Sequence, residues 1–218
     1  LPPVGYLAPS ADAAAFESAL CEIPALVGEF EKPQFFVYDP AICAHSRSGI
    51  QACTRCVDSC PADAISSLGD QGIRVDPHLC QGAGSCATAC PSGAIRYAYP
   101  QLGDGLERIR DLLGGYRGAG GTDPVLVVHD AEAGRQRWAE FSARAAGNLL
   151  PLEVAELGSL GMDQWLSALA FGARRVLLLE AGTTPHRVLQ ELKAQLEFAG
   201  ALLEGMGYPP AALALADT

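Results

Sequence analysis

The 218-residue sequence predicts two structural units, an α+β unit organised by cysteines and an α/β unit with a parallel sheet. Seven of the eight cysteines lie between Cys43 and Pro91, where they form two similar blocks. Beyond residue 121, apolar runs alternate with segments of helical periodicity, and no cysteine occurs. A glycine-rich stretch separates the two patterns and marks a boundary between the units.

Composition and charge limit the function classes. Apolar residues make up 49% of the chain and charged residues 18%, which describes a globular protein with ample core material. The net charge is −10 and no segment is basic, so nucleic acid and anionic membranes are not expected partners. No apolar run approaches the ~20 residues of a membrane span. Abundant unpaired cysteines suit a reducing compartment, and we expect a cytoplasmic protein.

Residues 1–33 precede the cysteine blocks and are expected to be helical. Ser10 is placed to cap a helix over Ala11–Leu20, which Pro24 ends or kinks. Cys21 lies beside the apolar side of this helix, where an unpaired cysteine is ordinarily a small buried hydrophobe.

The two cysteine blocks are copies of one unit. Both end in the pattern C-x3-C-P, and both continue alike, through Pro61–Ile65 and Pro91–Ile95. An internal repeat of this kind indicates a duplicated structural unit. The first block contains Cys43, Cys53, Cys56 and Cys60, and the second contains Cys80, Cys86 and Cys90.

These blocks resemble the ligand run C-x2-C-x2-C-x3-C-P of bacterial dicluster ferredoxins, in which the fourth cysteine of each run reaches the other cluster. The resemblance implies two iron–sulfur clusters that carry electrons. One cluster, of the 4Fe–4S type, would be held by Cys43, Cys53, Cys56 and Cys90. The other would be held by Cys60, Cys80 and Cys86.

The sequence departs from this pattern at two places. Nine residues, Ala44–Ala52, stand between the first two cysteines, where the pattern has two residues. Ala83 occupies the position of the second cysteine in the second block. The second cluster is therefore 3Fe–4S, or 4Fe–4S with water, a non-cysteine side chain or Cys21 on the fourth iron.

Two other roles for the cysteines fit less well. Zinc ribbons pair two C-x2-C knuckles, whereas here only Cys53 and Cys56 form one. A disulfide framework is typical of short secreted chains.

The α+β unit, residues 34–100, is expected to follow a β-α-β-β-α-β-like order and to depend on its metal. The turn residues Leu68–Gln71 predict a hairpin in its middle. The expected strands are Phe35–Tyr38, Ala64–Ser67, Gly72–Val75 and Ala94–Tyr97.

Residues 101–121 are expected to form a helix, Leu102–Tyr116, followed by a flexible glycine-rich linker. Residues 122–218 are expected to form a three-layer α/β unit with a parallel, flavodoxin-like sheet. Thr184 would cap the last helix, with Pro185 at its first position. The expected strands are Pro124–His129, Leu149–Ala155 and Arg175–Glu180.

A nucleotide or flavin site is an alternative use of this unit. The turn after its first strand, 129–134, has neither G-x-G-x-x-G nor a P-loop, and its acidic residues would repel a phosphate. The turn after the third strand, Ala181–Pro185, could present amides at a helix N-terminus. His129 and His186 are expected to be structural or surface histidines.

Within the α/β unit, the runs Glu156–Ser159 and Gly172–Leu179 resemble the delta (iron–sulfur) subunit of methyl-viologen-reducing hydrogenases. That family delivers electrons to heterodisulfide reductase, and its α/β domain carries cysteines. None follows Cys90 here, so that iron–sulfur site is not carried over. The resemblance implies a docking scaffold without a cofactor.

The sequence thus predicts a two-cluster electron-transfer module within a larger oxidoreductase assembly. Its partner would be a redox protein such as a dehydrogenase or a hydrogenase, and no catalytic residue is identified. One alternative is a redox enzyme whose α/β unit binds a flavin or nucleotide. Another is an interaction module that the clusters only fold.

Overall fold

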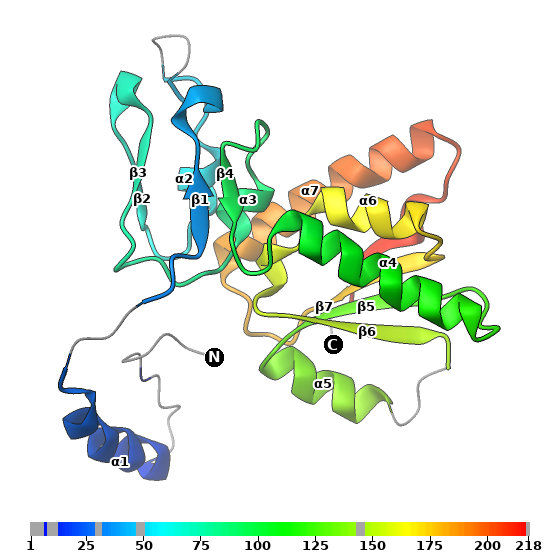
Figure 1. Cartoon of the computed structure of the whole chain (residues 1–218), viewed down its shortest axis with the longest axis horizontal. Helices are drawn as coiled ribbons and strands as arrows, with labels where there is room; N and C mark the ends of the chain where they lie inside the picture. The colour runs from blue at the N-terminus through cyan, green and yellow to red at the C-terminus, as the bar shows by residue number, and fades with distance from the viewer. Residues whose placement is uncertain (1–6, 8–12, 29–31, 47–50, 143–146, 217–218) are drawn as a thin grey trace.

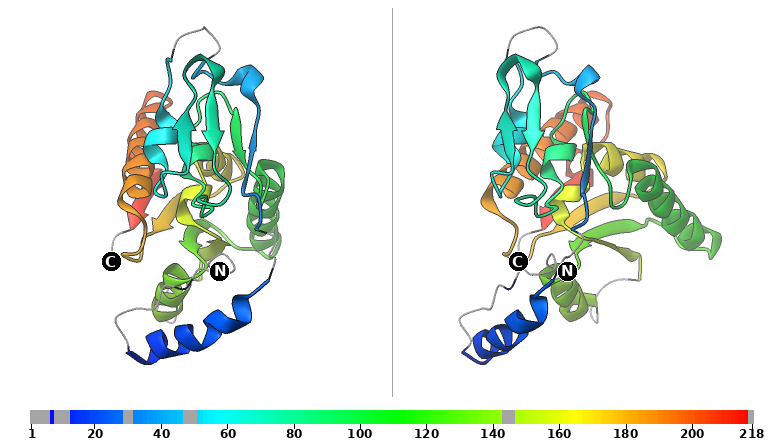
Figure 2. Two further views of the ribbon diagram at one scale, coloured as in Figure 1. Left: turned by 90° about the vertical axis from the view of Figure 1, so that its left-hand side faces the viewer. Right: turned by 60° about the vertical axis from the view of Figure 1, so that its left-hand side comes forward.

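The computed structural model describes residues 7, 13–28, 32–46, 51–142 and 147–216 (Figure 1). Helix α1 (Ala13–Glu22) continues as a 3-10 turn at Ile23–Leu26 and lies apart from the cysteine unit in all views (Figures 1 and 2). Its expected cap, Ser10, falls outside the described residues. Cys21 is exposed on this helix, which corrects the expectation that it is buried. None of the residues Ala13–Glu22 of α1 is buried, so the helix gives Cys21 no buried surroundings within the described part of the chain.

The cysteine unit has the predicted β-α-β-β-α-β order. Strands β1 and β4 pair antiparallel, as do β2 and β3. The short helices each carry or precede ligand-type cysteines, and three isoleucines close the core: Ile65, Ile73 and Ile95. The elements are β1 (Phe36–Tyr38), α2 (Arg55–Ser59), β2 (Ile65–Ser67), β3 (Ile73–Val75), α3 (Ser85–Thr88) and β4 (Ile95–Tyr97).

Helix α4 (Leu102–Gly118) joins the two units and extends further than expected. Gly114, Gly115 and Gly118 are helical, so the flexible linker predicted for them is wrong. Each glycine costs a helix roughly 1 kcal/mol relative to alanine. Burial of Ile109 and Leu113 in the core of the α/β unit outweighs that cost. Helix α4 therefore belongs to the α/β unit structurally.

The α/β unit contains one parallel sheet in the order β6-β5-β7-β8. The sequence missed β8, whose residues Leu213–Ala216 are short and follow a proline-rich turn. As predicted for an edge position, β6 borders the sheet and contains Pro151. The other strands are β5 (Val125–Asp130), β6 (Leu149–Val154) and β7 (Arg175–Leu179).

Helices cover both faces of this sheet, which gives three layers (Figure 1). Leu126 and Val128 of β5 face the main core with α4, α6 and α7, whereas Val125 and Val127 face Trp138 of α5. Helix α7 begins one residue later than expected, after Pro185, and no side chain caps it. The helices are α5 (Ala133–Ser142), α6 (Met162–Ala170) and α7 (His186–Gly205).

Among the described residues, no helix is both long and apolar enough to cross a bilayer.

Candidate metal centres

Four of the predicted ligands lie around one cavity of about 300 Å³, its opening included. All four are free thiols, and Cys43 and Cys56 are buried. Cys43 follows a 3-10 turn that Asp39 caps by accepting from the Ala41 amide at 2.9 Å. Helix α2 carries Cys56, and Cys90 follows α3. The cavity brings together Cys43, Cys53, Cys56 and Cys90.

His45, which the sequence analysis did not single out, lies in the insertion between Cys43 and Cys53 and connects its two ends. Its side chain is 1% exposed. Nδ1 lies against the Cys53 carbonyl, which can only accept, so Nδ1 carries the proton. Nε2 then accepts from the Ser67 hydroxyl at 2.7 Å. The Ala52 amide also donates to the His45 carbonyl, at 3.1 Å, so both ends of the insertion meet beside the cavity. The insertion's residues 47–50 lie outside the described part of the chain.

The other three predicted ligands lie around a second cavity of about 420 Å³, again with its opening. Ala83 lines this cavity at the position where the repeat has a cysteine. Cys21 does not line it. The cavity brings together Cys60, Cys80 and Cys86.

Two hydroxyl groups beside the second cavity already donate to backbone carbonyls. The Ser85 hydroxyl donates to Ser59 at 2.9 Å, and the Tyr97 hydroxyl donates to Gly82 at 2.9 Å. Gly82 and Gly84 both have positive φ, +76° and +75°, which the tight ligand loop requires. These contacts fix the loop on either side of Ala83.

The sulfur atoms lie in surroundings that suit a bound cation. Burial raises the pKa of the Cys56 thiol to about 11, and the nearby Cys90, Cys53 and Cys43 add to the rise. Burial and the neighbouring Cys60 raise the pKa of Cys86 to about 12. Buried thiolates that repel one another are stable only with positive charge among them, which bound iron would supply.

Backbone amides assist the sulfurs. Burial alone would raise the pKa of Cys90, but hydrogen bonds from the Ile95 amide, the Ser92 hydroxyl and the amides of Ser92 and Ala94 outweigh it and lower the pKa. The Ala64 amide donates to Cys60 Sγ at 3.3 Å. Amide hydrogen bonds to ligating sulfur are part of what sets a cluster's potential. The donor set therefore fits iron–sulfur clusters at both cavities.

The α/β unit packs directly on the loop around Ala83. A Cβ on Gly158 would lie 2.7 Å from the Ala83 carbonyl oxygen, and a Cβ on Gly84 would lie 2.4 Å from Ser159 Cα. These approaches are possible because both residues are glycine. The turn η4 (Leu157–Ser159) thus covers the backbone of the second ligand loop.

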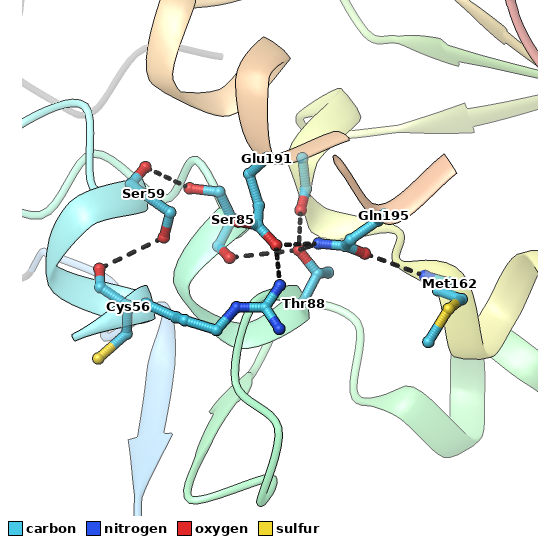
Figure 3. A network of polar contacts seen from close by, with 9 residues as sticks. Cys56, Ser59, Ser85, Thr88, Met162, Glu191 and Gln195 are labelled. Carbon is cyan, nitrogen blue, oxygen red and sulfur yellow. Dashed lines mark hydrogen bonds and ion pairs between the residues drawn. The ribbon is translucent and has the colours of Figure 1, made fainter. Parts of the chain in front are cut away.

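A polar network beside this turn ties α3 to α6 and α7 (Figure 3). The Thr88 hydroxyl contacts the Gly158 carbonyl at 3.1 Å, and Gln195 donates to the Thr88 hydroxyl at 3.4 Å. Gln195 also accepts from the Met162 amide at 3.2 Å and donates to Glu191 at 2.9 Å. Gln195 is 5% exposed, so the two units share a buried contact.

In the loops at the carboxyl ends of β5 and β7, backbone amides donate hydrogen bonds to a carboxylate at the start of the same loop. Asp130 accepts from the amides of Glu132 at 2.9 Å and Gly134 at 3.0 Å. Glu180 accepts from the amides of Gly182 at 2.8 Å and Thr184 at 3.1 Å. In α/β sheets these are the amides that would hold a phosphate. His129 is buried and bonds the Asp130 carbonyl through Nδ1, as expected for a structural histidine.

Comparison with known proteins matches residues 50–94 to the 4Fe-4S dicluster domain. A ferredoxin of Rickettsia felis is 35% identical over 60 residues, which are 28% of this chain and 54% of that protein. An uncharacterized ferredoxin of Methanocaldococcus jannaschii is 34% identical over 44 residues, 20% of this chain and 71% of that protein. The chain thus spans about half the length of the first relative.

Proposed function

We propose that this chain, which belongs to the ferredoxins, is an iron–sulfur electron-transfer module with two clusters. The main support for the proposal is the position of seven cysteines, of which four line one cavity and three line the other. Clusters bound there supply one-electron redox chemistry. The seven cysteines would hold them, and backbone amides such as that of Ala64 would donate to the ligating cysteine sulfurs.

The first cluster is proposed to be 4Fe–4S, on Cys43, Cys53, Cys56 and Cys90. The second is proposed to be 3Fe–4S, on Cys60, Cys80 and Cys86. Ala83, at the position where the repeat has a cysteine, has no side-chain atom that can bind iron, and the lining of the second cavity includes three cysteines. Three thiolates are the number that a 3Fe–4S cluster needs.

The α/β unit is proposed to be a flavodoxin-like docking domain related to the hydrogenase delta subunit. Its strand order, β6-β5-β7-β8, corresponds to the first four strands of the flavodoxin order 2-1-3-4-5. Asp130 and Glu180 already accept hydrogen bonds from the backbone amides that a flavin or nucleotide phosphate would need. This disfavours the alternative in which the α/β unit is an enzyme domain that binds a flavin or nucleotide. We take the domains as residues 34–100 and 101–218, with residues 1–33 as an N-terminal segment.

The partner is proposed to be another redox protein, such as a dehydrogenase or a hydrogenase, in a larger oxidoreductase assembly. We identify no catalytic side chain among the described residues. If the clusters served only to fold the chain, dithionite would fail to reduce them while partner binding persisted.

The test is anaerobic purification with iron and sulfide analysis and EPR spectroscopy. We expect a brown protein, absorbing near ~400 nm, with about seven iron and eight sulfide per chain. Cys56→Ser should remove the 4Fe–4S signal and Cys86→Ser the 3Fe–4S signal. The matched control Cys21→Ser should change neither, because Cys21 lines neither cavity. A colourless protein that holds zinc would contradict the proposal.

A further inference from the structure

Arg187, in the first turn of α7, reaches from the α/β unit to the second cluster site. Its Nη1 donates to the Cys60 carbonyl at 2.9 Å, and the same atom pairs with the carboxylate of Asp63. Cys60 is one of the three thiols around the second cavity. A cation of one unit and an anion of the other thus meet beside a single proposed ligand.

Asp63 has an unusual backbone for its residue type. Its φ is +48°, in the left-handed region that favours glycine. The equivalent residue in the second block is Gly93, with φ +67° and open space around its Cα. Both blocks therefore need the same turn after C-P, but the first block makes it with a residue that carries a carboxylate. That carboxylate meets Arg187, which accounts for an aspartate at a glycine position.

We propose that Arg187 and Asp63 set the reduction potential of the second cluster in opposite directions. This inference rests on the proposed function, because it requires a cluster on Cys60. Reduction adds negative charge to the cluster, so a guanidinium nearby stabilises the reduced form and a carboxylate nearby destabilises it. Arginine keeps its charge at any working pH. The α/β unit is then part of the electronic environment of the second cluster.

Replacing Arg187 and Asp63 one at a time distinguishes an effect of their charges from a purely structural effect. Loss of a structural contact would disturb the site in the same way whichever partner is changed. A role through charge requires shifts of opposite sign. Asn is the suitable replacement at residue 63, since it also tolerates the left-handed region. Lys193, exposed on the same helix α7, is a matched control because its replacement changes the net charge equally.

The experiment is an anaerobic redox titration of the 218-residue chain, followed by the EPR signals of both clusters. Arg187→Gln should lower, and Asp63→Asn raise, the ratio of reduced to oxidised second cluster at fixed potential, each by about threefold. A tenfold change would correspond to about 59 mV for a one-electron couple. Arg187→Lys should keep most of the wild-type ratio, and Lys193→Gln should leave both clusters unchanged.

Shifts of the same sign in Arg187→Gln and Asp63→Asn, or no shift in either, would overturn the inference. A shift in Lys193→Gln as large as in Arg187→Gln would also overturn it, because the effect would then come from net charge alone. Absence of two cluster signals in the wild type would instead refute the proposed function. The two failures are therefore distinguishable in one series.

Discussion

Replacing Gly158 by alanine probes the contact between the α/β unit and the second ligand loop. Gly158 is buried in η4, between α7 and the loop. Its new methyl group would lie 2.6 Å from Val188 Cγ1 and 2.7 Å from the Ala83 carbonyl oxygen. Both distances are shorter than side chains tolerate, and the second involves backbone that the ligand loop holds in place. Either the turn or the loop must move.

The expected cost follows from this overlap. Adding a methyl group to a packed site costs about 1–3 kcal/mol. The contact of Thr88 with the Gly158 carbonyl, 3.1 Å long, would also weaken as the turn moves. In a protein of this size each kcal/mol lowers the melting temperature by about 2–4 °C. We therefore expect Gly158→Ala to melt at least about 2 °C lower and to lose iron from the second cluster faster than from the first.

The matched control is Gly200→Ala in the interior of α7. A Cβ there meets only the Pro210 Cβ, at 3.7 Å, which is ordinary contact. Alanine is the better helix former by roughly 1 kcal/mol, so this variant should melt at or above the wild type. The measurement is circular dichroism under anaerobic conditions at one scan rate, with EPR of both clusters. Our account of the interface would be refuted if Gly158→Ala matched the wild type in both readouts.

Three further outcomes are expected. Ala83→Cys should replace the 3Fe–4S EPR signal by a second reducible 4Fe–4S cluster, and Ala87→Cys, outside the cavity, should not. Residues 101–218 expressed alone should unfold cooperatively without metal, whereas residues 122–218 should not, because they lack Ile109 and Leu113; circular dichroism melts of both decide this. Burial, with Asp130 and Glu132 nearby, raises the pKa of Glu156 from 4.5 to about 7, so the folded state loses stability as pH rises through this range. Glu156→Gln should therefore raise the melting temperature more at pH 8 than at pH 5.5, and only modestly, because Glu156 is exposed and solvent screens its charge.

Predictions from local sequence patterns were the most reliable. The alternation of strands and helices followed from periodicity. The ligand roles of Cys53, Cys56 and Cys60 stay a prediction from the repeat. The glycine-rich linker failed because packing of Ile109 and Leu113 decides the end of α4, and packing is not visible in local composition. The burial expected for Cys21 likewise does not occur, because Cys21 is exposed on α1.

Contacts between distant segments could not be predicted from the sequence. His45 could have been noticed as a histidine inside the insertion, but its partners Cys53 and Ser67 depend on how the insertion folds back. Arg187 and Asp63 are 124 residues apart, and an exposed arginine at a helix start is not informative by itself. Only the tertiary structure pairs them.

The differences between the two cysteine blocks have a common location. Ala83 replaces a cysteine, and its carbonyl lies where the α/β unit approaches through Gly158. Asp63 stands where the second block has Gly93, and it pairs with Arg187 of the α/β unit, whereas a Cβ on Gly93 would meet nothing within 4 Å among the described residues. Both positions thus lie on the side of the repeat that the α/β unit covers. Because the α/β unit contacts both positions, the two blocks have different surroundings there, which is a physical reason for their sequences to differ at residues 63 and 83.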